Sequence, residues 1–256
     1  LLGGFAGGAI MSGKYSSRMD QLESQIAELS SEEKQLVVNT GSTPAASSTA
    51  GGTMSASSIY DLACQQVVGI SSEITYSNFF GMTSSAAVSG SGFIVSSDGY
   101  IITNYHVIQN AYEGNFDINV MTHDGTKYIA TVVGTEQDND IAVLKIDAEG
   151  LNPVTFGDSD ELAVGDTVYA VGNPLGELEF SMSTGHVSAK DRAITTEEST
   201  TPINVFQIDA AVNSGNSGGP VYNDQGQVVG VVNAKYSATG VEGIGFAIPA
   251  NDAVSI

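Results

Sequence analysis

Short apolar runs separated by glycine turns dominate the chain from residue 59 to residue 256. The runs are rich in β-branched residues, and turns such as Ser97-Asp98-Gly99 and Asp224-Gln225-Gly226 stand between them. Many short strands joined by such turns favour an all-β barrel or sandwich over alternating βα units. We predict strands at 67–75, 88–95, 118–121, 128–134, 141–146, 167–171, 180–188, 203–208, 220–222, 228–232 and 243–247, and a further short strand just before His106.

The spacing of apolar residues before this domain is helical. They follow one another at steps of four and three, a heptad pattern that Glu33 interrupts. The pattern is carried by Tyr15, Met19, Leu22, Ile26, Leu29 and Leu36. Because so short a heptad run is near the lower limit for an independent coiled coil, residues 14–38 are predicted to form either a coiled-coil stalk or a single amphipathic helix.

Two segments flank this predicted stalk. Residues 1–13 are apolar and rich in glycine, but too few to cross a hydrocarbon layer that requires about 20 helical residues. We expect them to be the outer half of a membrane anchor, with the remnant of a signal segment or a flexible tail as the alternatives. Residues 39–58 consist mainly of Ser, Thr, Ala and Gly without charge, which predicts a flexible linker.

Composition narrows the range of partners. The 256 residues carry 8 Lys and Arg against 29 Asp and Glu, a net charge of −21 at pH 7. Nucleic acid is not expected as a partner, because phosphate binding needs clustered basic side chains. Such acidity favours solubility in a harsh or salty medium.

Metal and redox chemistry find little support in the sequence. Cys64 is the single cysteine, which leaves no internal disulfide and no cysteine cluster for zinc. Asp158, Asp160 and Glu161 lack the spacing and closing glutamate of an EF-hand loop. We therefore expect neither a metal nor a cofactor.

One serine lies in a glycine-rich turn between two predicted strands. Residues 213–220 read Asn-Ser-Gly-Asn-Ser-Gly-Gly-Pro, with Ser217 flanked by Gly215 and Gly218. A serine attacks a carbonyl when a base removes its proton and donors await the oxyanion, and small neighbours let both approach. The same residues also make an ordinary serine-rich turn, so the interpretation depends on partners elsewhere in the chain.

The histidines offer one good candidate base. His106, His123 and His186 all precede Ser217, which excludes an α/β-hydrolase because its triad histidine follows its serine. His106 comes directly after a short apolar strand, a placement that suits a base projecting into a cleft. His123 lies in a predicted turn and His186 within a predicted strand, and neither is expected to do chemistry.

An acid partner for His106 is also available. Asp140 immediately precedes the predicted strand 141–146, where its carboxylate can orient an imidazole and stabilise its cation. Asp138 is the rival, and its position favours a loop charge.

Taken together, these segments resemble the HtrA/Deg family of trypsin-fold serine proteases. The resemblance covers about residues 59–256 and rests on six ordered segments, 90–95, 103–108, 140–144, 172–174, 215–220 and 245–249. It implies a trypsin-like double six-stranded β-barrel whose active site lies in the cleft between the barrels.

The same resemblance assigns roles to individual residues. It makes His106 the general base, Asp140 its orienting acid and Ser217 the nucleophile. It places the oxyanion hole at Gly215, Asn216 and Ser217, with the backbone N–H groups of Gly215 and Ser217 as donors.

The function that the resemblance implies is a serine endopeptidase acting on unfolded or damaged proteins outside the cytoplasm. Its usual unit is a homotrimer, and the N-terminal segment would anchor it to a membrane in a single pass. No PDZ domain follows residue 256, so we expect either a fragment or an unusually short member. The alternatives are a chaperone-like sensor that binds unfolded chains with little cleavage and a non-peptidase acyl hydrolase.

Specificity is partly accessible from the sequence. Relatives that cleave after Lys or Arg carry an acid six positions before the nucleophile, where this chain has Ala211. A small or medium aliphatic P1 residue is therefore expected. By analogy, Val212, Asn233 and Ala234 line the pocket, and Lys235 limits its depth if it points inward.

Three segments have the composition of mobile loops, namely 173–180, 190–202 and 235–243. Such loops surround the site in this family and switch between ordered and disordered states. We therefore expect that the oxyanion turn is not permanently preorganised, and that substrate or assembly helps to set it.

Overall fold

The computed structural model describes residues 52–77, 83–173, 180–195, 201–234 and 243–255. The expected anchor at 1–13, the stalk at 14–38 and most of the linker lie outside the described residues, as do 174–179, 196–200 and 235–242. No helix among the described residues is long and apolar enough to span a membrane.

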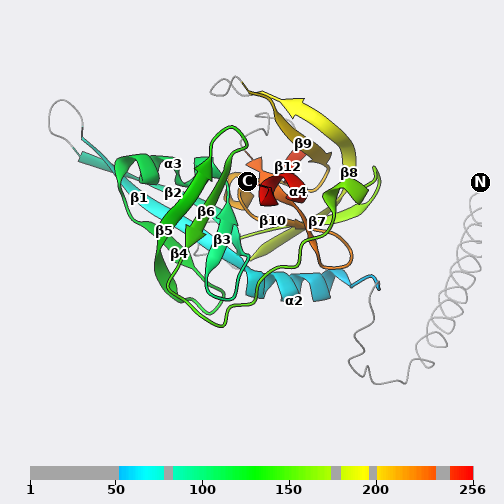
Figure 1. The fold of residues 1–256 in the computed structure, drawn as a ribbon, viewed down its shortest axis with the longest axis horizontal. Helices are drawn as coiled ribbons and strands as arrows, with labels where there is room; N and C mark the ends of the chain where they lie inside the picture. The colour runs from blue at the N-terminus through cyan, green and yellow to red at the C-terminus, as the bar shows by residue number, and fades with distance from the viewer. Residues whose placement is uncertain (1–51, 78–82, 174–179, 196–200, 235–242, 256) are drawn as a thin grey trace, which may run out of the picture. The chain divides into compact units, whose positions relative to one another are not determined.

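The first half of the described chain forms a closed antiparallel barrel with the strand order β1-β2-β3-β6-β5-β4 (Figure 1). Alternate side chains point inward, and Ile70, Ile101, Val120 and Leu144 are among those that fill it. Its strands are β1 (Val67–Ser77), β2 (Thr83–Ile94), β3 (Tyr100–Thr103), β4 (Ile118–Met121), β5 (Lys127–Glu136) and β6 (Ile141–Lys145).

The second half forms another closed barrel, with the order β10-β11-β12-β9-β8-β7. Val168, Phe206, Ile208 and Val229 belong to its own apolar core. Its strands are β7 (Thr167–Gly172), β8 (Ser181–Ile194), β9 (Ile203–Ile208), β10 (Pro220–Tyr222), β11 (Val228–Asn233) and β12 (Gly245–Pro249). The predicted all-β fold of two six-stranded barrels is thus confirmed.

Two predicted boundaries need correction. Residues 190–194, expected in a loop, continue β8 and pair with β9. Helix α2 (Ala56–Gln66) begins inside the predicted linker, with Ser55 as its N-cap, and occupies a stretch that was not predicted to be helical. The signal was available, because Ile59, Ala63 and Gln66 have helical spacing and all three are buried.

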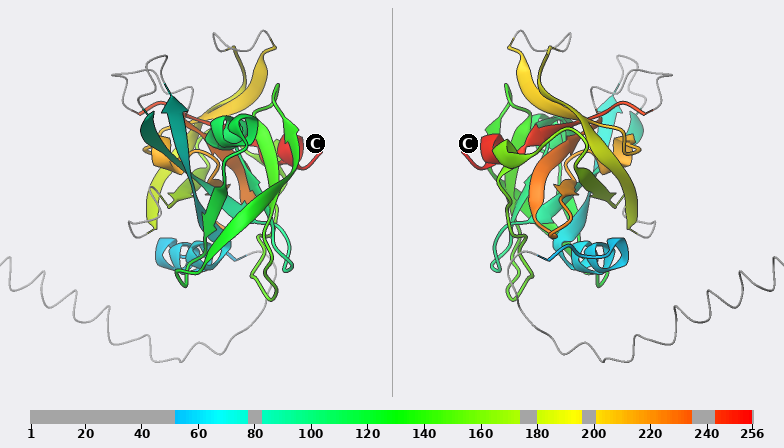
Figure 2. Two further views of the ribbon diagram at one scale, coloured as in Figure 1. Left: turned by 90° about the vertical axis from the view of Figure 1, so that its left-hand side faces the viewer. Right: turned by 90° about the vertical axis from the view of Figure 1, so that its right-hand side faces the viewer.

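Helix α2 lies along one side of the described domain, at the bottom of both views in Figure 2. Ile59 and Ala63 belong to an apolar cluster that includes Phe93 of the first barrel and Tyr222 of the second. The buried Tyr222 hydroxyl donates to Gln66 Oε1 over 3.0 Å, and Gln66 Nε2 donates to the Pro153 carbonyl over 2.8 Å. The helix therefore helps to fix how the barrels dock.

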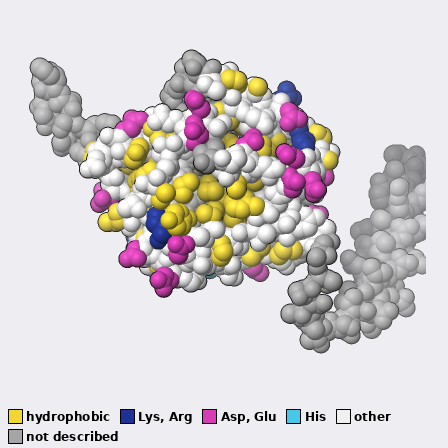
Figure 3. Space-filling view, viewed as in Figure 1, with side chains coloured by type: hydrophobic (Ala, Val, Ile, Leu, Met, Phe, Trp, Pro, Cys, Tyr) yellow, Lys and Arg dark blue, Asp and Glu magenta, His cyan; other side chains and the backbone are white. Residues whose placement is uncertain are grey.

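The surface carries the acidic excess of the sequence. In Figure 3, Asp and Glu side chains are spread around the face shown, while Lys and Arg occupy few places. Apolar side chains gather on this face over the first barrel.

Candidate active site

His106 lies in the first turn of α3 (Tyr105–Gly114), directly after β3. This helix was not predicted, although Tyr105, Ile108 and Ala111 have helical spacing and are buried. Asn104 is the N-cap and has extended backbone, so β3 passes into the helix without an intervening loop. His106, the expected base, is therefore held on a junction between a strand and a helix.

Asp140 binds His106 through both of its carboxylate oxygens. Oδ2 lies 2.6 Å from Nδ1 of the ring, and Oδ1 accepts the His106 backbone N–H over 2.8 Å. An ionised carboxylate only accepts hydrogen bonds, so Nδ1 carries a proton, and in the neutral ring Nε2 then keeps its lone pair. The side chain of Asp140 is 6% exposed and that of His106 is 20% exposed, which leaves the imidazole as the more accessible member of the pair.

The backbone of Asp140 is held as firmly as its side chain. Its φ of 55° is left-handed, a region that Asp tolerates better than most residues. Its carbonyl accepts the Tyr105 N–H over 3.1 Å and Asn104 Nδ2 over 3.0 Å, and its N–H donates to the Gln137 carbonyl over 3.2 Å. These three bonds fix the direction from which the carboxylate approaches His106.

Tyr105 supports the same junction, a role that the sequence analysis did not predict. Its hydroxyl donates to Glu113 Oε1 over 3.0 Å and accepts Gln137 Nε2 over 3.1 Å. Burial, together with the hydrogen bond to the Glu113 carboxylate, raises the pKa of Tyr105 to about 12. The phenol therefore stays neutral at physiological pH and keeps donating.

Asn233, which was expected to line the substrate pocket, lies at the end of β11 and contacts Asp140. Its side chain is 0% exposed, and Nδ2 donates to Asp140 Oδ2 over 2.8 Å. The next residue, Ala234, donates its backbone N–H to Ser217 Oγ over 3.1 Å. Because consecutive Cα atoms are about 3.8 Å apart, this one dipeptide places the Asp140 carboxylate and the Ser217 hydroxyl near one another.

Ser217 follows the short 3₁₀ helix η2 (Ser214–Asn216). Gly218 comes next with φ 82°, and a Cβ there would collide with Thr103 Oγ1 and the Ser91 carbonyl, so this position requires glycine. Ser217 itself is 2% exposed. Within the described residues its hydroxyl is hydrogen-bonded to the Ala234 N–H, and no hydrogen bond joins it to the His106 ring in this conformation.

The three residues expected at the oxyanion hole differ in whether their backbone N–H groups already donate a hydrogen bond within the turn. The Asn216 N–H donates to the Asn213 carbonyl over 2.8 Å and is used within the turn. That leaves Gly215 and Ser217 as the candidate donors to an oxyanion. The Gly215 carbonyl accepts Ser91 Oγ over 2.7 Å, and this serine received no role from the sequence although it lies in the motif Gly90-Ser91-Gly92.

The other residues expected at the pocket lie beside the nucleophile turn. Val212 is half-buried and packs close to Gly245 of β12. The carbonyl of the exposed Ala211 accepts Ser183 Oγ over 2.7 Å. Lys235 lies outside the described residues.

The remaining histidines and the rival acid stand apart from this group. The His123 ring, in the turn between β4 and β5, packs against Phe180 at 5.4 Å between centroids. His186 on β8 lies 3.7 Å from Asp209, and both side chains are largely exposed. Asp138 is exposed as well.

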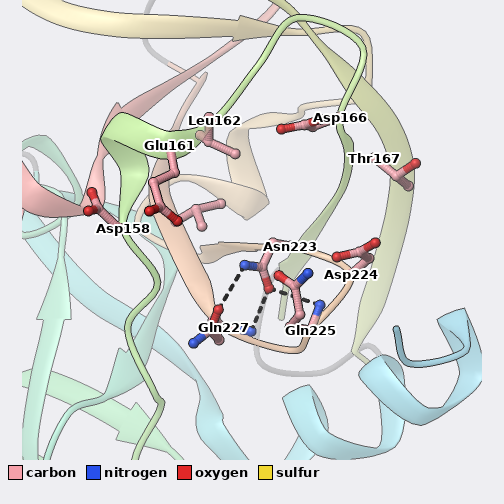
Figure 4. Close-up of a pocket in the computed structure, with 10 residues that line it drawn as sticks. Asp158, Glu161, Leu162, Asp166, Thr167, Asn223, Asp224, Gln225 and Gln227 are labelled. Carbon is pink, nitrogen blue, oxygen red and sulfur yellow. Dashed lines mark hydrogen bonds between the residues drawn. The ribbon is translucent and has the colours of Figure 1, made fainter. Parts of the chain in front are cut away.

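A separate pocket of about 280 Å³ opens in the second barrel, away from His106 and Ser217 (Figure 4). Asp158, Glu161, Asp166 and Asp224 are among its lining residues. Asp158 accepts hydrogen bonds from Asn251 Nδ2 and the Asp160 N–H, so part of this acidity stabilises local turns. Across the part of the chain that the structure describes, no three His, Cys, Asp or Glu side chains are arranged to hold a metal ion.

Two closed barrels, with a His–Asp pair on one and a serine in a Gly-Asn-Ser-Gly-Gly turn on the other, define a protease of the trypsin-like class. The family of the trypsin-like peptidase domain matches residues 90–231. Among curated proteins, a probable periplasmic serine endoprotease DegP-like of Chlamydia trachomatis is 46% identical over 188 residues, which covers 68% of this chain and 36% of that protein. The chain belongs to the HtrA/Deg family of trypsin-like serine proteases.

Other relatives agree with this assignment. The serine protease Do-like HtrA of Bacillus subtilis is 44% identical over 201 residues, covering 73% of this chain and 44% of that protein. The solved structure of the HtrA-type protease AlgW with a decapeptide superposes with a TM-score of 0.67 at 32% identity, covering 78% of this chain and 66% of that one. The chain spans between about a third and a half of the length of the curated relatives it matches.

Proposed function

We propose that this protein is a serine endopeptidase that uses Ser217, His106 and Asp140 as a catalytic triad. The observation that carries the proposal is the pairing of two contacts by one dipeptide: Asn233 binds Asp140 while Ala234 binds the Ser217 hydroxyl. Asn233 lies 93 positions from Asp140 along the chain, and Ala234 lies 17 positions from Ser217, so these two hydrogen bonds bring distant residues together. The proposal is further supported by relatives that are named as serine endoproteases.

The reaction is acyl transfer. His106 Nε2 takes the Ser217 proton as the hydroxyl attacks a peptide carbonyl, and the imidazolium that forms is stabilised by Asp140. The ring then gives that proton to the leaving amine, which departs and leaves an acyl-enzyme. Water, deprotonated by the same Nε2, then attacks the ester carbonyl, and the ring gives that proton to the Ser217 oxygen as its bond to the acyl group breaks.

The hydrogen bond from Ala234 is compatible with this chemistry. A serine hydroxyl has one donor proton and two acceptor lone pairs. The Ala234 N–H occupies one lone pair, so the proton stays available for His106. A rotation of the Ser217 side chain within the cleft brings the hydroxyl toward the ring, and catalytic hydrogen bonds often tighten in this way only when substrate binds.

The oxyanion turn is the part that substrate or assembly sets. Support comes from η2, in which the Asn216 N–H is engaged with Asn213 and only Gly215 and Ser217 remain as candidate donors. Isolated monomers are then labelled more slowly by a fluorophosphonate than the assembled enzyme. Equal labelling rates for the two forms contradict this part of the proposal.

The substrates are unfolded or misfolded proteins outside the cytoplasm, whose extended segments pair with a strand beside the cleft. The unit of assembly is a homotrimer, and the N-terminal segment attaches it to a membrane. Several relatives are named as probable periplasmic endoproteases, which supports the location.

The test is to incubate the full chain and Ser217→Ala with an unstructured protein and with a fluorophosphonate. The wild type is expected to fragment the protein and to be labelled, and the variant to do neither, with a loss in kcat on the order of 10⁶-fold. Ser72→Ala, the same change at a buried serine of β1, serves as the control. Binding without cleavage by the wild type identifies a chaperone-like sensor, and hydrolysis of esters but not peptides identifies a different acyl hydrolase.

A further inference from the structure

Ser91 of β2 reaches from the first barrel to the nucleophile turn of the second. It is 0% exposed. Its backbone N–H donates to the Ser217 carbonyl over 2.8 Å, and its hydroxyl donates to the Gly215 carbonyl over 2.7 Å. One residue therefore holds the oxyanion turn on both sides of Asn216.

The direction of the Ser91 hydroxyl is set by a second contact. The Asn173 N–H, just after β7, donates to Ser91 Oγ over 2.8 Å. An N–H can only donate, so the hydroxyl accepts there and its single proton goes to the Gly215 carbonyl. The Ser91 carbonyl in turn accepts Thr103 Oγ1 over 2.7 Å, which fixes the strand from which the hydroxyl extends.

The hydrogen bond from Ser91 to the Gly215 carbonyl restricts rotation of the peptide plane that follows Gly215. The Gly215 carbonyl belongs to the same peptide plane as the Asn216 N–H, which donates to the Asn213 carbonyl. Both ends of that plane are therefore bound. The Gly215 N–H belongs to the preceding peptide plane, which meets this one at the Gly215 Cα. Without the Ser91 hydroxyl, the permissive φ and ψ of Gly215 leave the relative orientation of the two planes less restrained, and with it the direction of the Gly215 N–H.

We propose that Ser91 is a positioning residue for the oxyanion turn, which it orients through the Gly215 carbonyl from the opposite barrel. This inference rests on the proposed protease function. The hydroxyl contacts no reacting atom, so its effect falls on the transition state, where the oxyanion forms, and not on binding of the peptide in the ground state.

The kinetic test compares Ser91→Ala with the control Ser72→Ala in the full chain. Misplacement of oxyanion donors is expected to lower kcat about ten- to a hundredfold in Ser91→Ala, with KM within about twofold. The affinity for a peptide boronate, a tetrahedral analogue, is expected to fall by the same factor as kcat/KM. Ser72→Ala is expected to change neither.

A second measurement needs no substrate. Amide hydrogen exchange at Asn216, followed by NMR, is expected to be about tenfold faster in Ser91→Ala than in Ser72→Ala, because the peptide plane has lost one of its two restraints. Equal exchange in the two variants overturns the inference even if the protein proves to be no protease. Unchanged boronate affinity in an active Ser91→Ala, or a loss confined to KM, overturns it as well, while the protease function stands.

Discussion

The two halves of the site lie on different barrels, and each half is hydrogen-bonded to a residue of the opposite barrel. Asp140 of the first barrel accepts a hydrogen bond from Asn233 of the second, and the Ser217 turn of the second accepts two from Ser91 of the first. The bonds differ in kind. Asn233 binds a carboxylate, whereas Ser91 binds neutral carbonyls, and hydrogen bonds to charged groups are roughly twice as strong.

This difference indicates how the two halves respond to change. The His106–Asp140 pair is overdetermined, since contacts to both carboxylate oxygens and to the Asp140 carbonyl fix it. The turn at Ser217 is held by weaker bonds around a glycine, so we expect it to be the half that substrate or assembly adjusts. A small change to the carboxylate half is expected to remove more activity.

Among changes to the residues that surround Ser217, the largest effect is expected from Asp140→Asn. The amide keeps the shape of the carboxylate but can present an N–H to His106 Nδ1, which favours the wrong tautomer. We expect kcat to fall about 10⁴-fold, as measured by peptide cleavage. The unfolding free energy should fall by about 1–3 kcal/mol, as measured by thermal unfolding, because an N–H₂ group at the place of Oδ2 cannot accept the hydrogen bond from Asn233 Nδ2. Asp138→Asn, the same change at the exposed rival acid, is the matched control, and an equal loss there would contradict the assignment of Asp140.

Asn233→Ala should have the next largest effect. Loss of a hydrogen bond to a charged group is expected to lower kcat about ten- to a hundredfold. KM should stay within about twofold, because the side chain is fully buried on Asp140. Steady-state kinetics on peptides with different P1 residues check this, since a change in P1 preference would return Asn233 to the pocket.

A third change weakens the docking of the barrels and leaves the Asn233–Asp140 and Ser91–Gly215 hydrogen bonds in place. Tyr222→Phe leaves Gln66 Oε1 buried without its donor, which is expected to cost about 1–3 kcal/mol of unfolding free energy. The Tm should fall by roughly 2–4 °C per kcal/mol, while kcat at 25 °C stays unchanged. Calorimetry and cleavage assays on the same samples test this. A parallel loss of kcat would show that the packing of α2 is coupled to the Asn233–Asp140 and Ser91–Gly215 hydrogen bonds.

The smallest effect is expected far from the cleft and serves as a baseline. The Asn251 amide donates to Asp158 and lowers the pKa of that carboxyl. In Asn251→Ala the pKa of Asp158 should rise toward its ordinary value, as measured by carboxyl NMR titration. Since the folded pKa is depressed, the stabilisation is present above about pH 4 and is lost as the pH falls through the lowered pKa.

Asp124 is the internal control for that titration. Its pKa is lowered chiefly by the Thr122 hydroxyl, which lies in the other barrel and does not depend on Asn251. An unchanged Asp158, or a shift of Asp124, would contradict the prediction.

The sequence by itself determined the strand pattern, the family and the order of the histidine, aspartate and serine. These depend on local information: β-branched runs between glycine turns, and motifs such as Gly-Asn-Ser-Gly-Gly whose backbone needs are visible in the residues themselves. Helices α2 and α3 were also readable, because their buried residues have helical spacing. They were missed because the strand-like period of the surrounding chain was extended over them.

Only the tertiary structure decided which polar side chains brace the site. Asn233 meets Asp140 across 93 residues, Ser91 meets Gly215 across 124, and Gln66 meets Tyr222 across 156. Each of these bonds exists because barrel closure and docking bring distant strands together, and neither periodicity nor spacing along the chain reports such a contact. For that reason the contact of Asn233 with Asp140 and the contact of Ser91 with Gly215 could not be predicted from the sequence.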